Sequence, residues 1–421
     1  MNIPRMSRVR QKIDGPTLDN IADALSSQLN QIRHELNISN GQSVAIACSS
    51  RGIANYSEIV ASIVSNLKLL GLHPFIVPAI GSHGGATAEG QQQVLANLGI
   101  TMERTGAPVR SSMEVVKIAE TEDDIPVYID KLAAGGDHIV LINRIKKHTE
   151  FEHEFESGLL KLMAIGLGKQ KGAETLHHAM LRYGYPHVIL TAARQVIRKA
   201  NILLGVAVVE NGLRQTAAIE VIKPAEIEKR EKELFKKANE LDVRLPFEAA
   251  DILIIDEMGK EISGTGFDTK VVGRIGLPLF SKEPETPKIK RIIACDLTEE
   301  SEGNAIGIGN ADFVTRRLVD KIDLDALYTN GLTGATPEMV RIPMTLKNDK
   351  ECLTAAIRSV GPIPADELKI IRIKNTRQLG ELEVSEAYLT EISQRLDLVM
   401  VKERRPLVFD AQDNLLPFSK D

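Results

Sequence analysis

Two histidines and one arginine stand in polar or glycine-containing turns in the first half of the chain. Arg51 lies in Cys-Ser-Ser-Arg-Gly, His83 in Gly-Ser-His-Gly-Gly, and His148 at the end of Asn-Arg-Ile-Lys-Lys-His. An arginine can hold a carboxylate through two parallel hydrogen bonds, and two histidines can act as a general acid and a general base. Each turn alone is also compatible with a structural role. The three together predict a site that binds a carboxylate and moves a proton.

A lysine lies inside the most apolar part of the segment 148–178. The neighbours of Lys161 are the apolar residues Leu159, Leu160, Leu162, Met163 and Ile165. Ser157 is predicted as the N-cap of this helix, and the glycine-rich residues 166–172 as its end. Two interpretations of Lys161 are open. Its ammonium reaches solvent from an amphipathic helix, or it is a desolvated, reactive amine suited to covalent attachment.

Two adjacent histidines, His177 and His178, follow in a segment predicted to be helical. Neighbouring residues on a helix point in different directions, so the pair is a poor chelate. One imidazole can still bind a metal such as nickel, and a cofactor must then supply further ligands. The alternating glutamates within residues 150–156 are interpreted as a solvated loop rather than a hard-cation site. Their alternation with Phe151, His153 and Phe155 is also compatible with an edge strand.

An alternation of short apolar runs and helix-period segments must position these residues. Strands are predicted over residues 43–48, 74–80, 137–142 and 202–209, and helices over residues 56–70 and 87–98. Strands that alternate with helices favour a parallel α/β sheet. Ligands of such sheets bind beyond the carboxyl ends of the strands, and the three turns follow three of these ends.

A charged helix predicted over residues 227–244 leads out of this first α/β unit. Further strands are predicted over residues 251–255, 289–295, 326–328 and 368–373. We therefore expect two α/β domains with Rossmann-like parallel sheets, formed by residues 1–247 and 248–404. The tail 405–421 can return to the first domain.

Two lysines follow the first strand of the second series. Lys260 and Lys270 lie in loops after residues 251–255, where groups that bind a ligand are expected. Either lysine would pair with a carboxylate or phosphate, or remain a surface lysine. We assign Lys270 to substrate binding.

The composition limits the classes of function. The 421 residues are 43% hydrophobic and 26% charged, as in a globular protein long enough for two domains. A net charge of −5 without a basic run argues against nucleic-acid or anionic-membrane partners. No apolar run is long enough to cross a bilayer, and no signal-like segment begins the chain, so a cytoplasmic location is expected. The three cysteines are too widely spaced to suggest a disulfide framework or a cysteine zinc site.

Four segments, in order, resemble the nickel-pincer-dependent lactate racemase family. They are the turns at Arg51 and His83, the segment at His148, and Ser157-Gly-Leu-Leu-Lys161 with His177 downstream. The resemblance covers roughly the first half of the chain. It implies two α/β domains with the active site in the interdomain cleft. It also implies a nickel-pincer nucleotide, pyridinium-3-thioamide-5-thiocarboxylic acid mononucleotide, which separate biosynthesis enzymes make.

The resemblance also implies roles for individual residues. Lys161 would bear the cofactor covalently, Ser157 would also belong to the cofactor-binding site, and His177 would bind nickel. Arg51 would hold the carboxylate of a small 2-hydroxy acid. His83 and His148 would exchange its hydroxyl proton from opposite faces while the C2 hydride moves to the cofactor and back. The chain is therefore expected to be an isomerase, a racemase or epimerase of a 2-hydroxy acid.

The chain departs from the family pattern in ways that bear on its substrate. The residues before Arg51 lack the acidic residue of lactate racemase, and the chain contains no tryptophan to contact a substrate. These changes favour a longer acid, such as malate or a sugar acid, over lactate. His153 competes with His148 for the second acid/base role, although His-Thr-x-Phe at His148 fits the motif better.

Two alternative functions remain open from the sequence. One is a metal-independent acid/base enzyme that uses His83 and His148, in which Lys161 is structural. The other is a non-catalytic protein that binds a hydroxy acid or a nucleotide. Activity without nickel would indicate the first, and function that survives replacement of His83 would indicate the second.

Overall fold

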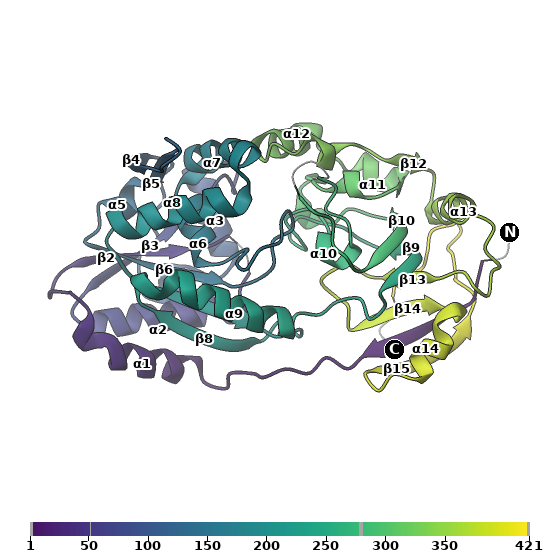
Figure 1. Cartoon of the computed structure of the whole chain (residues 1–421), viewed down its shortest axis with the longest axis horizontal. Coiled ribbons are helices and arrows are strands. Elements are labelled where there is room, and N and C mark those ends of the chain that lie inside the picture. Colours follow the sequence, from purple (N-terminus) through teal and green to yellow (C-terminus); the bar gives the residue numbers. More distant parts are fainter. Residues whose placement is uncertain (1–2, 51, 278–280, 419–421) are drawn as a thin grey trace. The chain divides into compact units, whose positions relative to one another are not determined.

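The chain packs as two compact units, which Figure 1 shows with their helices and strands. The computed structural model describes residues 3–50, 52–277 and 281–418. The N-terminal unit consists of residues 14–148 and 152–242. The C-terminal unit consists of the described residues of 1–13, 149–151 and 243–421.

A five-stranded sheet forms the centre of the N-terminal unit, with the strand order β3-β2-β6-β7-β8. Its strands are β2 (Ser43–Cys48), β3 (His73–Pro78), β6 (His138–Arg144), β7 (Ile202–Glu210) and β8 (Thr216–Ile222). The first four run parallel, and β8 pairs antiparallel with β7. The inner strands β2, β6 and β7 are runs of Val, Ile, Leu and Ala that are almost wholly buried, as expected for a parallel sheet covered on both faces.

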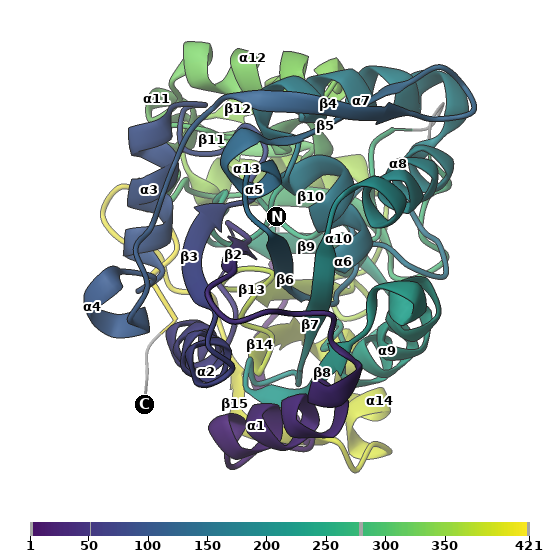
Figure 2. The ribbon, with the colours of Figure 1, turned by 90° about the vertical axis from the view of Figure 1, so that its left-hand side faces the viewer.

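Helices cover both faces of this sheet (Figure 2). The helices of the unit are α1 (Ile21–Ile32), α2 (Tyr56–Leu69), α3 (Ala88–Asn97), α4 (Met102–Thr105), α5 (Lys131–Ala134), α6 (Leu159–Lys161), α7 (Lys169–Tyr183), α8 (Tyr185–Lys199) and α9 (Ile227–Leu241). On one face, α1 and α2 bury Leu25, Ile59 and Ile63 against Ile46 and Val140 of the sheet. On the other face, α6 and α9 approach Gly205 of β7, where an added Cβ would lie 2.6 Å from Leu159.

A small antiparallel hairpin completes the N-terminal unit. Its strands are β4 (Val115–Glu120) and β5 (Pro126–Asp130). Asp130, the last residue of β5, caps α5 by accepting hydrogen bonds from the backbone N–H groups of Leu132 and Ala133. This cap fixes the junction between the hairpin and α5, which contacts β2 and β6 of the five-stranded sheet.

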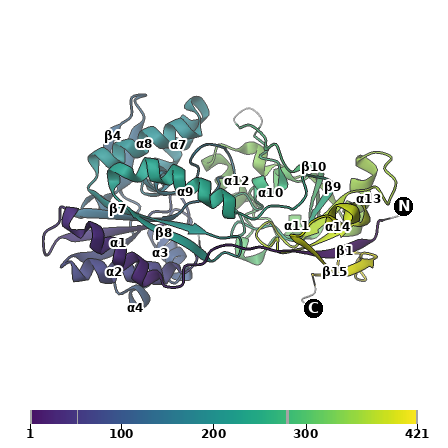
Figure 3. The ribbon, with the colours of Figure 1, turned by 60° about the horizontal axis from the view of Figure 1, so that its bottom comes forward.

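The C-terminal unit contains an eight-stranded mixed sheet in its described residues, in the order β12-β11-β10-β9-β13-β14-β1-β15. The strands are β1 (Met6–Gln11), β9 (Ala249–Ile255), β10 (Lys288–Ala294), β11 (Phe313–Thr315), β12 (Met344–Leu346), β13 (Ile370–Ile373), β14 (Glu381–Ser385) and β15 (Leu398–Arg405). The five strands from β12 to β13 are parallel, and β14, β1 and β15 continue antiparallel. Figure 3 shows β1, the first strand of the chain, beside β15, the last.

Apolar cores lie on both faces of this sheet. The helices are α10 (Thr269–Val272), α11 (Arg316–Asp320), α12 (Leu324–Thr333), α13 (Asp349–Ser359) and α14 (Leu389–Ser393). Helix α13 packs Cys352 and Leu353 against Ile252 and Ile254 of β9. The other helices contribute to the opposite core, which contains Leu253.

The α/β class with largely parallel sheets is therefore confirmed, and several predicted elements differ in detail. Residues 326–328 were expected to form a strand but belong to α12, because Asp323 caps a helix there by accepting from the Ala326 N–H. The predicted edge strand within residues 150–156 is absent from the described structure. The antiparallel strands β1, β14 and β15 were not predicted.

The domain limits at residues 247 and 248 stay a prediction. The tail after residue 404 was allowed to return to the first domain, but its described residues group with the C-terminal unit. The reason is that Leu415 is buried in the core beneath α13. Among the described residues, no helix is long and apolar enough to cross a membrane.

Candidate active site

Polar residues gather beyond the carboxyl ends of β3, β2 and β6, which are neighbours in the five-stranded sheet. The Nδ1 atom of His83, in the turn after β3, lies 2.6 Å from the Oγ atom of Ser50, which follows β2. Arg51, the predicted carboxylate-binding residue, lies outside the described residues. The chain thus brings the His83 turn and the residue before Arg51 together, where parallel sheets bind ligands.

The second predicted acid/base residue contacts the predicted cofactor-bearing lysine. The Lys161 Nζ atom is within hydrogen-bond distance of the Nε2 atom of His148. His148 is buried, and the Lys161 side chain is half-buried. The backbone N–H of His148 donates to the Oε2 atom of Glu156 at 2.5 Å, which holds the loop after β6 in place. An amine and an imidazole in this contact can pass a proton between them.

The backbone around Lys161 has an unusual local structure. Helix α6 has only three residues and continues into a π-helical turn over Leu162–Gly166, before α7 begins at Lys169. Such turns are frequent at functional sites. Gly166 is required there, because an added Cβ would lie 2.5 Å from the carbonyl oxygen of Ala79 at the end of β3. The carbonyl of Gly166 also accepts from the Gly81 N–H at 3.2 Å, so the Lys161 segment contacts the His83 turn.

A buried glutamate holds the beginning of α6. Glu231 of α9 is fully buried, and its Oε2 atom accepts from the backbone N–H of Leu160 at 3.0 Å. An added Cβ on Gly158 would lie 2.4 Å from the Glu231 carboxylate, so glycine allows the close approach. Burial raises the pKa of Glu231 to about 7, although hydrogen bonds from the Leu160 and Leu159 N–H groups oppose the rise. Glu231 therefore fixes the helical turn that presents Lys161.

The predicted nickel ligand lies on α7. His177 is half-buried with its Nδ1 atom inside the protein, whereas His178 is exposed. Adjacent residues of the helix therefore differ in environment, as the sequence indicated. Within residues 3–50, 52–277 and 281–418, no cluster of three or more His, Cys, Asp or Glu side chains is arranged to hold a metal. A metal on His177 would need ligands from a bound molecule.

One expectation about this segment was wrong. Ser157 does not cap the helix. Gly158 takes the N-cap position, and the backbone of Ser157 pairs with Lys146 instead. The helical turn that contains Lys161 does end within the glycine-rich residues 166–172, at Gly166, but Gly172 already lies inside α7.

The acidic loop is exposed only in part. Glu152 and Glu154 are exposed, as predicted for a solvated loop, but Glu156 is buried and bonded to His148. His153, the competitor of His148, is exposed, and its ring packs edge-on against Phe155 with centroids 4.8 Å apart. The structure therefore places His148, and not His153, in contact with Lys161.

The lysines of the C-terminal unit bond to their own unit. Lys270 on α10 is buried, and its Nζ atom donates to the carbonyl oxygen of Phe151 at 3.0 Å. Lys260 contacts the side-chain oxygen of Asn330. The substrate-binding role assigned to Lys270 stays a prediction, and it would have to coexist with the bond to Phe151.

Sequence reasoning missed three buried residues that hold these segments. Glu231 stood in a run of charges that looked solvated, although Ile227, Leu234, Phe235 and Ala238 mark a buried face of the same helix. Lys169 stood in the glycine-rich segment interpreted as a helix end, and Gln91 in an unremarkable polar helix. Their burial depends on contacts with segments 71 to 91 residues away, which no local pattern indicates.

These features define a two-unit α/β protein whose N-terminal sheet carries a lysine–histidine site at its strand ends. Residues 5–185 match the family model described as the lactate racemase N-terminal domain. The predicted resemblance to the lactate racemase family is therefore confirmed over this span, which contains β2, β3, β6, Lys161 and His177. Comparison with curated protein sequences gave no match.

Two solved structures are similar to the chain. A crystal structure of a protein from Thermotoga maritima has 14% sequence identity and a TM-score of 0.51, covering 78% of this chain and 84% of that one. The lactate racemase apoprotein from Thermoanaerobacterium thermosaccharolyticum has 15% identity and a TM-score of 0.46, covering 80% of this chain and 83% of that one. At this identity, the first likeness supports the fold alone.

Proposed function

We propose that the chain is a racemase or epimerase of a 2-hydroxy acid that works with a nickel-pincer nucleotide attached to Lys161. The observation that carries the proposal is the contact between Lys161 Nζ and His148 Nε2 within a lactate racemase N-terminal domain. Lysine attacks an electrophile as the neutral amine. His148 can take the ammonium proton on Nε2 and leave that amine free to form the covalent bond.

The residues present fit the proposed cofactor. Lys161 is half-buried at the junction of α6 and a π-helical turn, which limits its motion without sealing it from a ligand. His177 offers one imidazole, a suitable nickel ligand, and the cofactor would provide the others. When bound, this group would supply a hydride acceptor and donor for the C2 carbon of the substrate.

The acid/base work falls to the two histidines. His83 and His148 would each remove or return the hydroxyl proton of one enantiomer, because two mirror-image substrates present their hydroxyl groups to opposite sides. The Oγ atom of Ser50, 2.6 Å from Nδ1, orients the His83 ring. Arg51, which follows Ser50, would bind the carboxylate through two parallel hydrogen bonds.

The proposed substrate is a 2-hydroxy acid more polar than lactate, such as malate or a sugar acid. The absence of tryptophan from the sequence removes the apolar contact expected for a methyl group. A small-molecule acid and the enzymes that make the cofactor are then the partners of the chain.

The test is a chiral assay of protein produced together with the cofactor-biosynthesis enzymes. Pure enantiomers of lactate, malate and sugar acids are incubated with the protein, and the opposite configuration at C2 is measured by chiral chromatography. The proposal expects inversion of at least one acid, with nickel required. It also expects His83→Asn and His148→Asn each to lower the rate by about 10²–10⁴.

Two outcomes would indicate the other functions. Inversion that proceeds at full rate in nickel-free protein would mean a metal-independent acid/base enzyme. Binding of a hydroxy acid without inversion, unchanged by His83→Asn, would mean a non-catalytic binding protein.

A further inference from the structure

A buried ammonium group lies beneath the His83 turn and takes no part in the proposed chemistry. Lys169, the first residue of α7, is 0% exposed. Its Nζ atom donates to the carbonyl oxygen of Pro78 at 2.5 Å and to Oε1 of Gln91 at 2.9 Å, and it pairs with Asp130 at 2.8 Å. Two hydrogen bonds and one ion pair thus hold the ammonium inside the protein. Burial lowers the pKa of Lys169, and the Asp130 carboxylate opposes this effect.

The network continues from Lys169 to the turn that carries His83. Gln91 of α3 is also fully buried, and its Nε2 atom donates to the carbonyl oxygens of Gly81 at 2.8 Å and His83 at 3.3 Å. An ammonium can only donate, so it requires the Gln91 side-chain oxygen to face Lys169. The amide nitrogen must then face the turn. The charge of Lys169 therefore sets the direction of both bonds to the turn.

Lys169 adopts a backbone conformation that side chains other than glycine rarely take. Its φ angle is +53°, in the left-handed region. Such a conformation persists where surrounding contacts over-determine it. Here the two hydrogen bonds and the ion pair of the ammonium hold the residue, and with it the start of the helix that carries His177.

We propose that Lys169, Asp130 and Gln91 form a positioning network that fixes the His83 imidazole relative to helix α7. None of the three touches a reacting atom. The network joins the end of β3, the His83 turn and the first turn of α7, and so couples the proposed acid/base group to the helix of the proposed nickel ligand. Its importance for catalysis rests on the proposed function, whereas its effect on the turn does not.

The network can be broken at Gln91 without leaving a charge unpaired. Gln91→Met removes the bonds to Gly81 and His83 but keeps the Lys169–Asp130 pair. Gln92→Met is the matched control, because Gln92 is the next residue of the same helix and is exposed. Gln91→Glu is a second variant. It preserves an acceptor for Lys169 but cannot donate to the two carbonyls, so it tests the turn even if the methionine variant does not fold.

Two measurements on the cofactor-free protein report on the turn. The first is hydrogen–deuterium exchange of peptides covering residues 79–86, compared with the core strand at residues 43–48. The second is the rate at which diethyl pyrocarbonate modifies His83, with the exposed His73 as internal reference. Neither depends on cofactor or substrate, so their failure can be told apart from failure of the proposed function.

The proposal expects a local effect. In Gln91→Met and Gln91→Glu, exchange at residues 79–86 should rise about tenfold, a change of roughly 1.4 kcal/mol in local opening. The modification rate of His83 relative to His73 should also change, and Gln92→Met should match the unmodified chain. Unchanged exchange in both Gln91 variants would overturn the proposal. So would an equal rise at residues 43–48, because that pattern means general destabilisation.

Discussion

The ends of the parallel strands differ in chemistry between the two units. In the N-terminal unit, β2, β3 and β6 are followed by Ser50, His83 and His148, which contact an imidazole, a hydroxyl and an amine, respectively. In the C-terminal unit, β9 and β10 are followed by carboxylates, which bond to guanidinium and ammonium groups of the same unit. Both regions are polar and partly buried, but only the first contains groups that titrate near neutral pH in their ordinary state.

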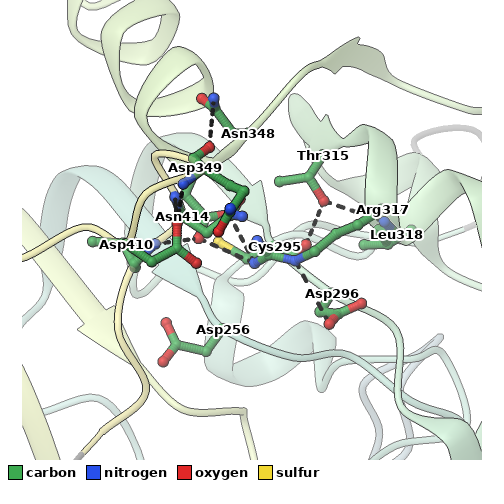
Figure 4. A network of polar contacts seen from close by, with 12 residues as sticks. Asp256, Cys295, Asp296, Thr315, Arg317, Leu318, Asn348, Asp349, Asp410 and Asn414 are labelled. Atoms are coloured by element: carbon green, nitrogen blue, oxygen red, sulfur yellow. Dashed lines mark hydrogen bonds and ion pairs between the residues drawn. The ribbon is translucent and has the colours of Figure 1, made fainter.

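Carboxylates of the C-terminal unit are held in ion pairs, and Figure 4 shows Arg317 with its partners Asp296 and Asp349. Asp349, at the start of α13, is buried, and both its oxygens lie within 3.0 Å of the Arg317 Nη2 atom. It also accepts from the Leu415 N–H at 2.7 Å. Asp256 pairs with Arg372 through two bonds of 2.7 and 2.8 Å. These bonds of Asp349 and Asp256 hold the C-terminal tail and α13 to the sheet.

Under the proposed function, strand ends serve chemistry in one unit and stability in the other. A charged group that is satisfied by a fixed partner stabilises the fold and is costly to disturb. Lys161 and His148, in contrast, contact each other as an amine and an imidazole, which can exchange a proton. Substitutions should therefore lower activity in one region and stability in the other.

The largest effect is expected at Lys161. Lys161→Arg keeps a positive charge but removes the nucleophilic amine, so inversion of any 2-hydroxy acid should fall by about a thousandfold or more. The unfolding midpoint should change little. Lys171→Arg is the control, since Lys171 is exposed and stacks on the Tyr128 ring at 4.6 Å. Equal activity of the two variants would contradict the role of Lys161.

The opposite result is expected at Asp349. Asp349→Ala removes a buried carboxylate from a partly exposed Arg317 and leaves the Leu415 N–H without its acceptor, which should lower the free energy of unfolding of the C-terminal unit by about 1–3 kcal/mol. Denaturation in urea measures this loss. Labelling of Lys161 by cofactor at low temperature should remain as in the unmodified chain. If Asp349→Ala lowered the labelling of Lys161 but left the free energy of unfolding unchanged, the proposed difference between the two regions would be wrong.

The pH dependence of stability should identify Glu231. Its folded-state pKa of about 7 lies above its ordinary value of 4.5, so the folded state binds the proton more tightly than the unfolded state. This carboxyl therefore favours folding at low pH, and its contribution is lost as pH rises from 4.5 to 7, by about 3 kcal/mol. Denaturation at pH 4.5, 6 and 8 should show Glu231→Gln gaining stability relative to the unmodified chain as pH rises. A difference that does not vary with pH would show that Glu231 is not raised in pKa.

The smallest effect is expected at Gly158. Gly158→Ala places a Cβ 2.4 Å from the Glu231 carboxylate, and overpacking of this kind costs about 1–3 kcal/mol. The shift of α6 should also slow reaction of Lys161 with an amine reagent, measured by peptide mass spectrometry. Gly361→Ala serves as a comparison, because no atom lies within 4 Å of an added Cβ there, although its own φ of +99° adds strain. If Lys161 reacted at the same rate in Gly158→Ala, the position of α6 would not control the reactivity of the amine.

Local patterns predicted the strands and helices that position the site. Runs such as residues 43–48 and 202–209 are short, apolar and bounded by turns, and they form β2 and β7 with nearly the expected bounds. Helix α2 ends within one residue of its expected limit, because Gly71 with φ of +78° stops it. The apolar pattern was sufficient to predict an element where it agreed with the residues that begin or end strands and helices.

Contacts distant in sequence could not be predicted in the same way. Strands β1 and β14 pair across more than 370 residues, and neither has a distinctive apolar run. Residues 326–328 were expected to form a strand, but Asp323 caps a helix that contains them. The partners of Lys169 and Glu231 come from other elements, so their roles appear only once the chain has folded.

The measurement that tests the central claim most directly is the intact mass and nickel content of the protein made with the cofactor-biosynthesis enzymes, followed by peptide mapping. We expect a nucleotide-sized adduct on Lys161 and about one nickel per chain, matching the single imidazole of His177. Both should be absent from Lys161→Arg. An unmodified Lys161 and no nickel, in cells where a control racemase is fully loaded, would contradict the account.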